Sequence, residues 1–207
     1  MNEELKNILT KVGCLYKKYG IKSVTMDDIS RELGISKKTL YQYVQDKNEL
    51  VGHVINLAIE NQINAFDKIF NLGLNAIDEI FEVQKVLRQM IRDNNPSEEY
   101  DLKKYYPDQF QKILTIKRDQ IFSHTLANLK KGKAEGLYRP ELNEEIIAKI
   151  QWMRVQSTIE NQIFTDDELI SPQSFLEVFI YHIRGIASDK GIKVLEKKLK
   201  ELESNNN

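Results

Sequence analysis

Residues 25–47 read TMDDISRELGISKKTLYQYVQDK and carry the signals of two short helices joined by a tight turn. Thr25 is a typical N-cap residue, and Asp28, three positions later, can complete a capping box. Gly34 follows an apolar face of helical spacing and can supply the left-handed conformation that ends a helix tightly. Ser36 is a second N-cap residue. The segment therefore predicts a helix, a turn and a second helix.

The second of these helices offers few side chains to a core. Leu40 and Val44 form an i, i+4 pair that can face inwards. The remaining side chains of this helix can bond phosphates or base edges: Lys37, Lys38, Thr39, Tyr41, Gln42 and Tyr43. Packing alone poorly explains a short helix with only two apolar anchors and so many polar or aromatic neighbours. The pattern indicates a helix that enters a DNA groove.

These motifs strongly resemble the helix-turn-helix of the TetR (tetracycline-repressor) family of bacterial transcription regulators. The resemblance is carried by Thr25, Leu33-Gly34-Ile35-Ser36, Thr39-Leu40-Tyr41 with Val44, Lys47 and Glu49-Leu50. It covers roughly the first quarter of the chain. The sequence departs from the family at Asp27 and Asp28, where some relatives place a basic residue that reads a base. We therefore expect the second helix to carry more of the base reading.

Side-chain chemistry suggests which residues read bases and which hold the DNA backbone. The best candidates for base edges are Lys37 and Lys38, which suit guanine, and Gln42, which suits adenine. Thr39 suits a thymine methyl group or a phosphate. The expected phosphate contacts are Thr25, Ser36, Tyr41, Tyr43 and Lys47. For the last three of these, the family resemblance also implies contacts to the backbone.

Composition places the chain among ordinary folded proteins. Its 207 residues are 41% hydrophobic and 29% charged, enough for a substantial core in one or two domains. No apolar run reaches the roughly 18 residues of a membrane helix, and the N-terminal sequence MNEELKN lacks the apolar stretch of a signal peptide. We expect a cytoplasmic protein with no membrane partner. Cys14 is the single cysteine, and its apolar neighbours predict a core position.

Charge is unevenly distributed along the chain. The net charge is −1, but residues 1–47 contain nine basic and six acidic side chains, so this part carries +3 and the remainder −4. A mildly basic head on an acidic body fits a DNA-binding module attached to a larger domain. So small a difference also fits a chance asymmetry of surface charges.

Strand signals are almost absent, and helical spacing of apolar residues continues to the C-terminal region. The sequence predicts an all-α fold with two domains. We expect residues 1–47 to form a three-helix DNA-binding head with the helix-turn-helix and residues 48–207 to form a helical bundle, which the resemblance implies serves effector binding and dimerisation. A connecting helix begins near residue 47, and later long helices span about 146–162 and 175–187. The last two show apolar side chains on more than one face, as helices buried within or between chains do.

The resemblance implies a homodimer and a cavity for a small-molecule effector of unknown identity. The family pairs through helices that correspond to the last long helices here, so the expected interface residues are Ile150, Met153, Phe175, Phe179 and Ile183. The candidate pocket residues are Phe66, Phe70, Phe110, Trp152 and Gln156, each of which could equally be an ordinary core residue. The expected partners are double-stranded DNA, a second copy of the chain and the effector.

Two other classes of function remain open at this point. The chain could be an all-helical small-molecule-binding or scaffold protein without operator binding, which Asp27 and Asp28 would favour. An enzyme requires a catalytic cluster, and the sequence shows no phosphate-binding glycine loop, HExxH or GxSxG motif. The three histidines lack partners at metal-ligand spacing. We expect no catalytic residues, no metal and no cofactor.

Overall fold

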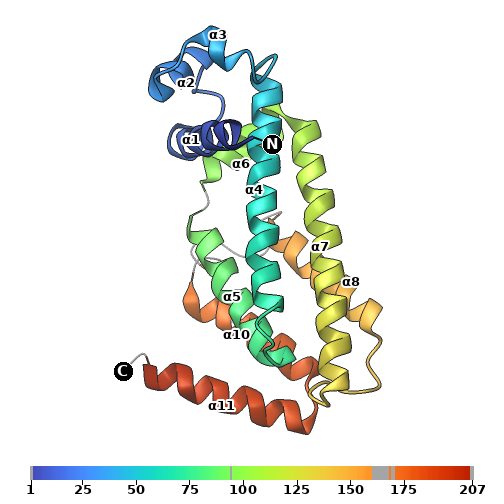
Figure 1. Ribbon diagram of the computed structural model, residues 1–207. Coiled ribbons are helices and arrows are strands. Elements are labelled where there is room, and N and C mark those ends of the chain that lie inside the picture. Colours follow the sequence, from blue (N-terminus) through green and yellow to red (C-terminus); the bar gives the residue numbers. More distant parts are fainter. Residues whose placement is uncertain (1, 94, 160–167, 169–170, 206–207) are drawn as a thin grey trace. The chain divides into compact units, whose positions relative to one another are not determined.

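The computed structural model describes residues 2–93, 95–159, 168 and 171–205, and it is built from helices (Figure 1). The helices are α1 (Glu3–Tyr19), α2 (Met26–Leu33), α3 (Lys37–Leu40), α4 (Lys47–Phe70), α5 (Ala76–Arg92), α6 (Pro96–Tyr105), α7 (Pro107–Ala134), α8 (Glu144–Ile159), α10 (Pro172–Ile186) and α11 (Asp189–Asn205). The described residues form no strand, although one isolated bridge pairs Tyr138 with Ala187. The all-α prediction is confirmed. None of the helices in these ranges is long and apolar enough to cross a membrane.

Packing divides the chain into two compact units. The first contains residues 1–65 and 93–116, and the second contains residues 66–92 and 117–207. The first unit therefore holds α1 to α3 together with α6 and parts of α4 and α7. The functional boundary predicted after residue 47 stays a prediction, because it concerns what each part does rather than how it packs.

The core of the first unit is built on one face of α1. Its buried residues include Leu9, Val12, Tyr16, Ile29, Leu40, Val44, Leu50 and Val51. Leu102 from α6 and Tyr106 pack against this cluster, so α6 belongs to the support of the head. Cys14 is exposed, and its predicted core position is wrong. Val12 and Tyr16 are four residues apart and face the core from the same side of α1. Cys14 lies midway between them in the sequence and therefore points to the other side of the helix.

Polar contacts attach α6 to the loop that leads into α2. Asp101 accepts a hydrogen bond from the Lys22 backbone N–H at 2.8 Å, and the Lys22 ammonium donates to the Tyr105 hydroxyl at 2.7 Å. The side chain of Asn95 donates to the carbonyl of Lys17 near the end of α1. These contacts fix the position from which α2 begins.

The second unit has its own core and a buried polar network. Its apolar cluster includes Ile77, Phe81, Leu129, Tyr138, Phe179, Ile183 and Leu195. Glu79 is only 3% exposed, and its carboxylate accepts hydrogen bonds from Asn128 at 2.9 Å and from Lys131. The Tyr138 hydroxyl donates to Asn128 at 2.9 Å. Because every buried polar group in this network has a partner, the unit avoids the cost of unsatisfied burial.

The predicted interface residues fall into two groups. Phe179 and Ile183 are buried by their own chain, and Phe179 packs against Phe81 with ring centroids 4.8 Å apart. A side chain already covered in this way has no surface to offer a partner, so these two residues are corrected from interface to core. Ile150 and Met153 are exposed. The side chain of Phe175 lies outside what the structure describes.

Candidate nucleic-acid interface

The first turn of α2 is organised by a complete capping box. Thr25 Oγ1 accepts a hydrogen bond from the Asp28 backbone N–H at 3.2 Å, and Asp28 Oδ2 accepts from the Thr25 N–H at 3.0 Å. The Thr25 hydroxyl also donates to Asp28 at 2.6 Å. Hydrogen bonds from the Thr25 hydroxyl and backbone lower the pKa of the Asp28 carboxyl. Asp28 therefore stabilises the start of α2. The Thr25 hydroxyl must break its bond to Asp28 before it can donate to a phosphate.

Gly34 ends α2 in the predicted left-handed turn. Its φ and ψ are 67° and 27°. The N–H of Ile35 donates to the carbonyl of Ser30 at 3.0 Å and that of Gly34 to Arg31 at 3.2 Å, the pattern of a Schellman ending. Since only glycine adopts this conformation without steric cost, the turn depends on residue 34.

Helix α3 is shorter than the stretch from 37 to 43 that its side chains suggest. Ser36 caps it by accepting from the Thr39 N–H at 3.0 Å, and the regular helix ends at Leu40. The chain continues in tighter i to i+3 bonds, from Gln42 to Thr39 and from Tyr43 to Leu40, both at 3.1 Å. These turns keep the side chains of 41–43 next to α3.

Most of the predicted DNA-contacting side chains are exposed to solvent. Six of the nine are exposed, namely Thr25, Ser36, Lys37, Lys38, Tyr41 and Gln42. Thr39, Tyr43 and Lys47 are partly buried. Leu40 and Val44 are buried in the core of the first unit, as their spacing predicted. The segment thus presents polar side chains outwards from two apolar anchors.

Thr25, Ser36 and Thr39 make the hydrogen bonds of the helix caps, and three more of these side chains have partners elsewhere in the first unit. The Lys37 ammonium lies 2.6 Å from the Asp27 carboxylate, and this contact raises the pKa of Lys37. Tyr43 donates to Glu4 of α1, which raises the pKa of its hydroxyl. Lys47 donates to the carbonyl of Lys22 at 3.2 Å, and partial burial lowers the pKa of its ammonium.

The same segment matches a known family of regulators. Residues 15–54 match the model of the bacterial regulatory proteins of the tetR family. This segment is similar to the corresponding part of TetR-family regulators. An uncharacterised HTH-type transcriptional regulator of Bacillus subtilis, YvaF, is 34% identical over 104 residues, which are 50% of this chain and 54% of that protein. The chain thus matches about half the length of this curated relative.

Solved structures extend the likeness in fold to nearly the full length of the chain. A transcriptional regulator from Cytophaga hutchinsonii has a TM-score of 0.78 at 17% identity, with 90% of this chain and 100% of that chain covered. A TetR regulator from Chloroflexus aurantiacus has a TM-score of 0.67 at 14% identity, with 89% and 97% covered. AibR, solved with isovaleryl coenzyme A and operator DNA, has a TM-score of 0.55 at 14% identity, with 84% and 97% covered. At these identities the likeness concerns the fold.

The candidate effector residues do not all lie in one unit. Phe110 belongs to the first unit, where the Lys103 ammonium lies 5.3 Å from its ring. Phe66 and Phe70 belong to the second unit and both contact His124, with ring centroids 6.3 and 4.6 Å away. Burial lowers the pKa of this histidine. Trp152 is partly buried on α8, and Gln156 is exposed on the same helix.

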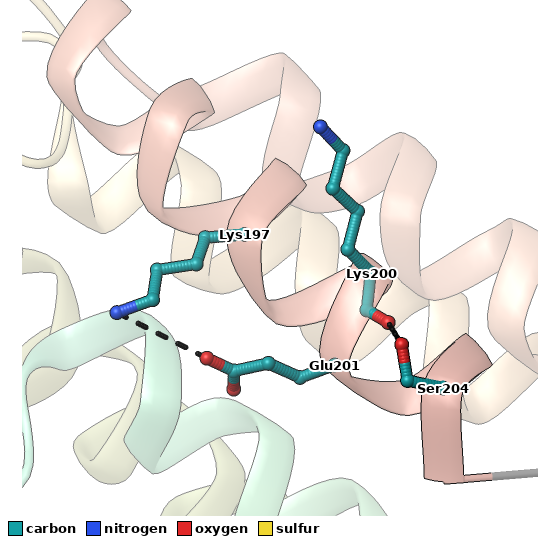
Figure 2. Close-up of a pocket in the computed structure, with 4 residues that line it drawn as sticks. All are labelled: Lys197, Lys200, Glu201 and Ser204. Carbon is teal, nitrogen blue, oxygen red and sulfur yellow. Dashed lines mark hydrogen bonds and ion pairs between the residues drawn. The ribbon is translucent and has the colours of Figure 1, made fainter.

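A hollow of about 470 Å³ lies on α11 and contains none of these candidates. Figure 2 shows its four lining residues, Lys197, Lys200, Glu201 and Ser204. Lys197 and Glu201 form an ion pair at 4.0 Å, and Ser204 donates to the Lys200 carbonyl at 2.9 Å. Because a single helix with largely charged side chains supplies this lining, the hollow resembles a solvated helix face more than an effector cavity.

Sequence reasoning missed the residues that hold the predicted contacts in place. Glu4, Lys22 and Asp27 are partners of Tyr43, Lys47 and Lys37, and His124 joins Phe66 and Phe70. Of these residues, only Asp27 stands out in the sequence, because some relatives in the family have a basic residue at this point. The others are far from their partners in the sequence, and no local spacing connects them.

Proposed function

We propose that this protein is a TetR-type regulator, a cytoplasmic homodimeric repressor that binds a palindromic operator and is released by a small molecule. The observation that carries the proposal is the exposed set of DNA-competent side chains on a short helix anchored by Leu40 and Val44. Lys37, Lys38 and Gln42 would read base edges in the major groove. The phosphate contacts would come from Thr25, Ser36, Thr39, Tyr41, Tyr43 and Lys47.

An exposed apolar row on α8 supports pairing with a second copy. Ile146, Ile150 and Met153 are spaced by four and three residues and are 54%, 50% and 66% exposed, so they lie on one face of the helix. On α10, Leu176 and Tyr181 are exposed as well. Apolar groups gathered in this way usually mark an interface. A second copy is the fitting partner, because two heads are needed to read a symmetric site.

The effector would act through the equilibrium between two states of the dimer. A ligand that binds more tightly to the state with a changed spacing of the two heads lowers operator affinity. The decrease is at most the ratio of the affinities of the ligand for the two states. Within the second unit, the proposed effector site would contain Phe66 and Phe70, whose rings both contact His124, together with Trp152 and Gln156. Phe110 belongs to the first unit and stays a separate candidate. AibR was solved in complex with isovaleryl coenzyme A and operator DNA, so a protein of similar fold binds both a small molecule and DNA.

A binding measurement with the DNA that flanks the gene of this protein tests the proposal. We expect a shifted band for that DNA at concentrations where a random duplex of equal length stays free. Sedimentation of the free protein should give a dimer at micromolar concentration. Absence of binding to any duplex would favour the alternative, an all-helical small-molecule-binding or scaffold protein.

The salt dependence of binding tests the assignment of Lys47 to a phosphate. Each neutralised phosphate contributes about one unit to the slope of log K against log salt. Lys47→Ala should therefore lower the slope by about one per head and weaken binding alike on all sequences. Gln42→Ala should instead relax preference at one base pair per half-site. An unchanged slope for Lys47→Ala would mean that Lys47 contacts no phosphate and serves only to donate to the Lys22 carbonyl.

A further inference from the structure

The ion pair between Asp27 and Lys37 joins the two helices of the helix-turn-helix on their outer side. Asp27 lies in the first turn of α2 and Lys37 is the first residue of α3, with Oδ1 and Nζ 2.6 Å apart. Asp28 forms the capping box, so Asp27 is not needed to begin α2. The side chains of Asp27 and Lys37 are 59% and 50% exposed. An incoming duplex can therefore reach both.

The pair changes what Lys37 offers to DNA. A carboxylate beside the ammonium repels phosphates and cancels most of the attraction that the lysine would exert on them. An ammonium has three N–H donors, so one bond to Asp27 leaves two for the O6 and N7 acceptors of a guanine. The carboxylate also limits the rotamers of a long, flexible side chain, and this lowers the entropy lost when a base is bound.

Lys38 provides a comparison within the same helix. It is exposed like Lys37, but within the part of the chain that the structure describes it makes no ion pair. The two neighbouring lysines have the same chemistry and differ in the acid beside one of them. Lys38 is thus suited to any nearby phosphate, whereas Lys37 is held in one direction.

We propose that Asp27 is a specificity-determining residue, which keeps Lys37 from backbone phosphates and directs it to a guanine edge. The inference rests on the proposed entry of α3 into the major groove. On random DNA the pair persists and Lys37 adds little to affinity. At the operator Lys37 bridges Asp27 and the base. Asp27 thereby raises the ratio of operator to random binding without touching the DNA.

The test is a double-mutant cycle on the full-length protein. The operator is first selected with the wild-type protein from a duplex library, and affinities for it and for a random duplex are then measured by fluorescence anisotropy at several salt concentrations. Asp27→Asn should raise the affinity for random DNA about three- to tenfold and steepen its salt slope by about one per head. The ratio of operator to random affinity should fall by a similar factor. Repeated selection with Asp27→Asn should lose the preference for guanine at one position per half-site.

Combining Asp27→Asn with a second substitution tests whether the fall in the ratio depends on the ion pair between Asp27 and Lys37. In a Lys37→Ala background, Asp27→Asn should leave the ratio unchanged, because the lysine that it releases is gone. In a Lys38→Ala background the fall in the ratio should persist. Asp27→Glu keeps the carboxylate and should restore most of the ratio, and thermal denaturation of each variant identifies any loss of folding.

The outcomes separate the inference from the function on which it rests. Equal gains of Asp27→Asn on operator and random DNA would overturn the inference, because Asp27 would then act only as a repulsive charge. An undiminished effect in the Lys37→Ala background would overturn it as well. Failure of the wild-type protein to select any duplex would instead refute the proposed function.

Discussion

The helix-turn-helix and the pair α8 and α10 contrast in how their residues are held. In the first region, Thr25, Gly34 and Ser36 are held by bonds within five positions of the chain. In the second region, Phe179 and Ile183 lie in a core that other helices complete, while Ile150 and Met153 on α8 are exposed. Caps and turns are local chemistry, whereas the burial of an apolar residue depends on which distant helix covers it. Variants in both regions can test this difference.

The largest effect is expected at Phe179, which is buried in the core of the second unit. Phe179→Ala removes a ring that is 3% exposed and packs edge-on against Phe81. It should lower the free energy of unfolding by about 3–5 kcal/mol. Urea denaturation measures this, and the loss should not depend on protein concentration. A variant with wild-type stability but a dissociated dimer would return Phe179 to the interface.

A charge on the exposed apolar row of α8 should instead dissociate the dimer and leave the stability of each chain intact. Ile150→Glu or Met153→Glu leaves the core intact, because both side chains are at least half exposed. Each should shift sedimentation at micromolar concentration from dimer to monomer. The monomers should also lose operator affinity, since two linked heads bind far more tightly than one. A dimer that persists in both variants would mean that another surface pairs the chains.

The turn of the helix-turn-helix should show an intermediate effect that depends on backbone conformation alone. A Cβ at Gly34 would meet no atom within 4 Å, but φ is 67°. Gly34→Ala should therefore cost about 1–2 kcal/mol through the left-handed conformation. Gly185 in α10 is the control, since it also has open space but no positive φ. Gly185→Ala should be neutral or stabilising by about 0.5–1 kcal/mol. Urea denaturation of the two variants measures both changes in the free energy of unfolding. Equal changes would contradict the role of backbone conformation at residue 34.

Much of the fold could be predicted from the sequence because its signals are local. The helical spacing of apolar residues gave the all-α class, and the capping box of Thr25 with Asp28 was visible as two residues three positions apart. The anchors Leu40 and Val44 are buried as their i, i+4 spacing implied. By contrast, the end of α3 at Leu40 rather than near residue 43 depends on a change to tighter hydrogen bonds, which side-chain chemistry does not reveal.

The parts that could not be predicted are contacts between distant positions. Lys37 and Asp27 are ten residues apart on different helices, and Asp101 meets Lys22 across 79 positions. No periodicity connects such residues. The apolar faces of α8 and α10 were visible, but Phe179 and Met153 looked alike in the sequence. Which of them is covered by the chain itself follows only from the packing of α5 against α10, where Phe81 meets Phe179.

The smallest expected effect concerns the capping box and its dependence on pH. The Thr25 hydroxyl is the largest cause of the lowered pKa of Asp28, followed by the Thr25 backbone N–H. Thr25→Ala removes the first of these bonds, so the pKa of Asp28 should rise towards its ordinary range, and Thr25→Ser should keep it low. An NMR titration of the Asp28 carboxyl measures both variants.

The sign of the pH dependence follows from the direction of this shift. Because the folded pKa of Asp28 lies below the unfolded value of about 3.9, its ionised carboxylate stabilises the head above that value. This contribution is lost as the pH falls through the lowered folded pKa. The difference in stability between wild type and Thr25→Ala should therefore be full at pH 7 and shrink below about pH 4. The Ile150→Glu variant, whose change lies far along the chain from the capping box, should leave the titration of Asp28 unchanged. A Thr25→Ala protein with an unaltered Asp28 titration would show that the backbone N–H and Arg31 suffice to hold the carboxylate, and that the local chemistry of this region is less dependent on its cap than the geometry indicates.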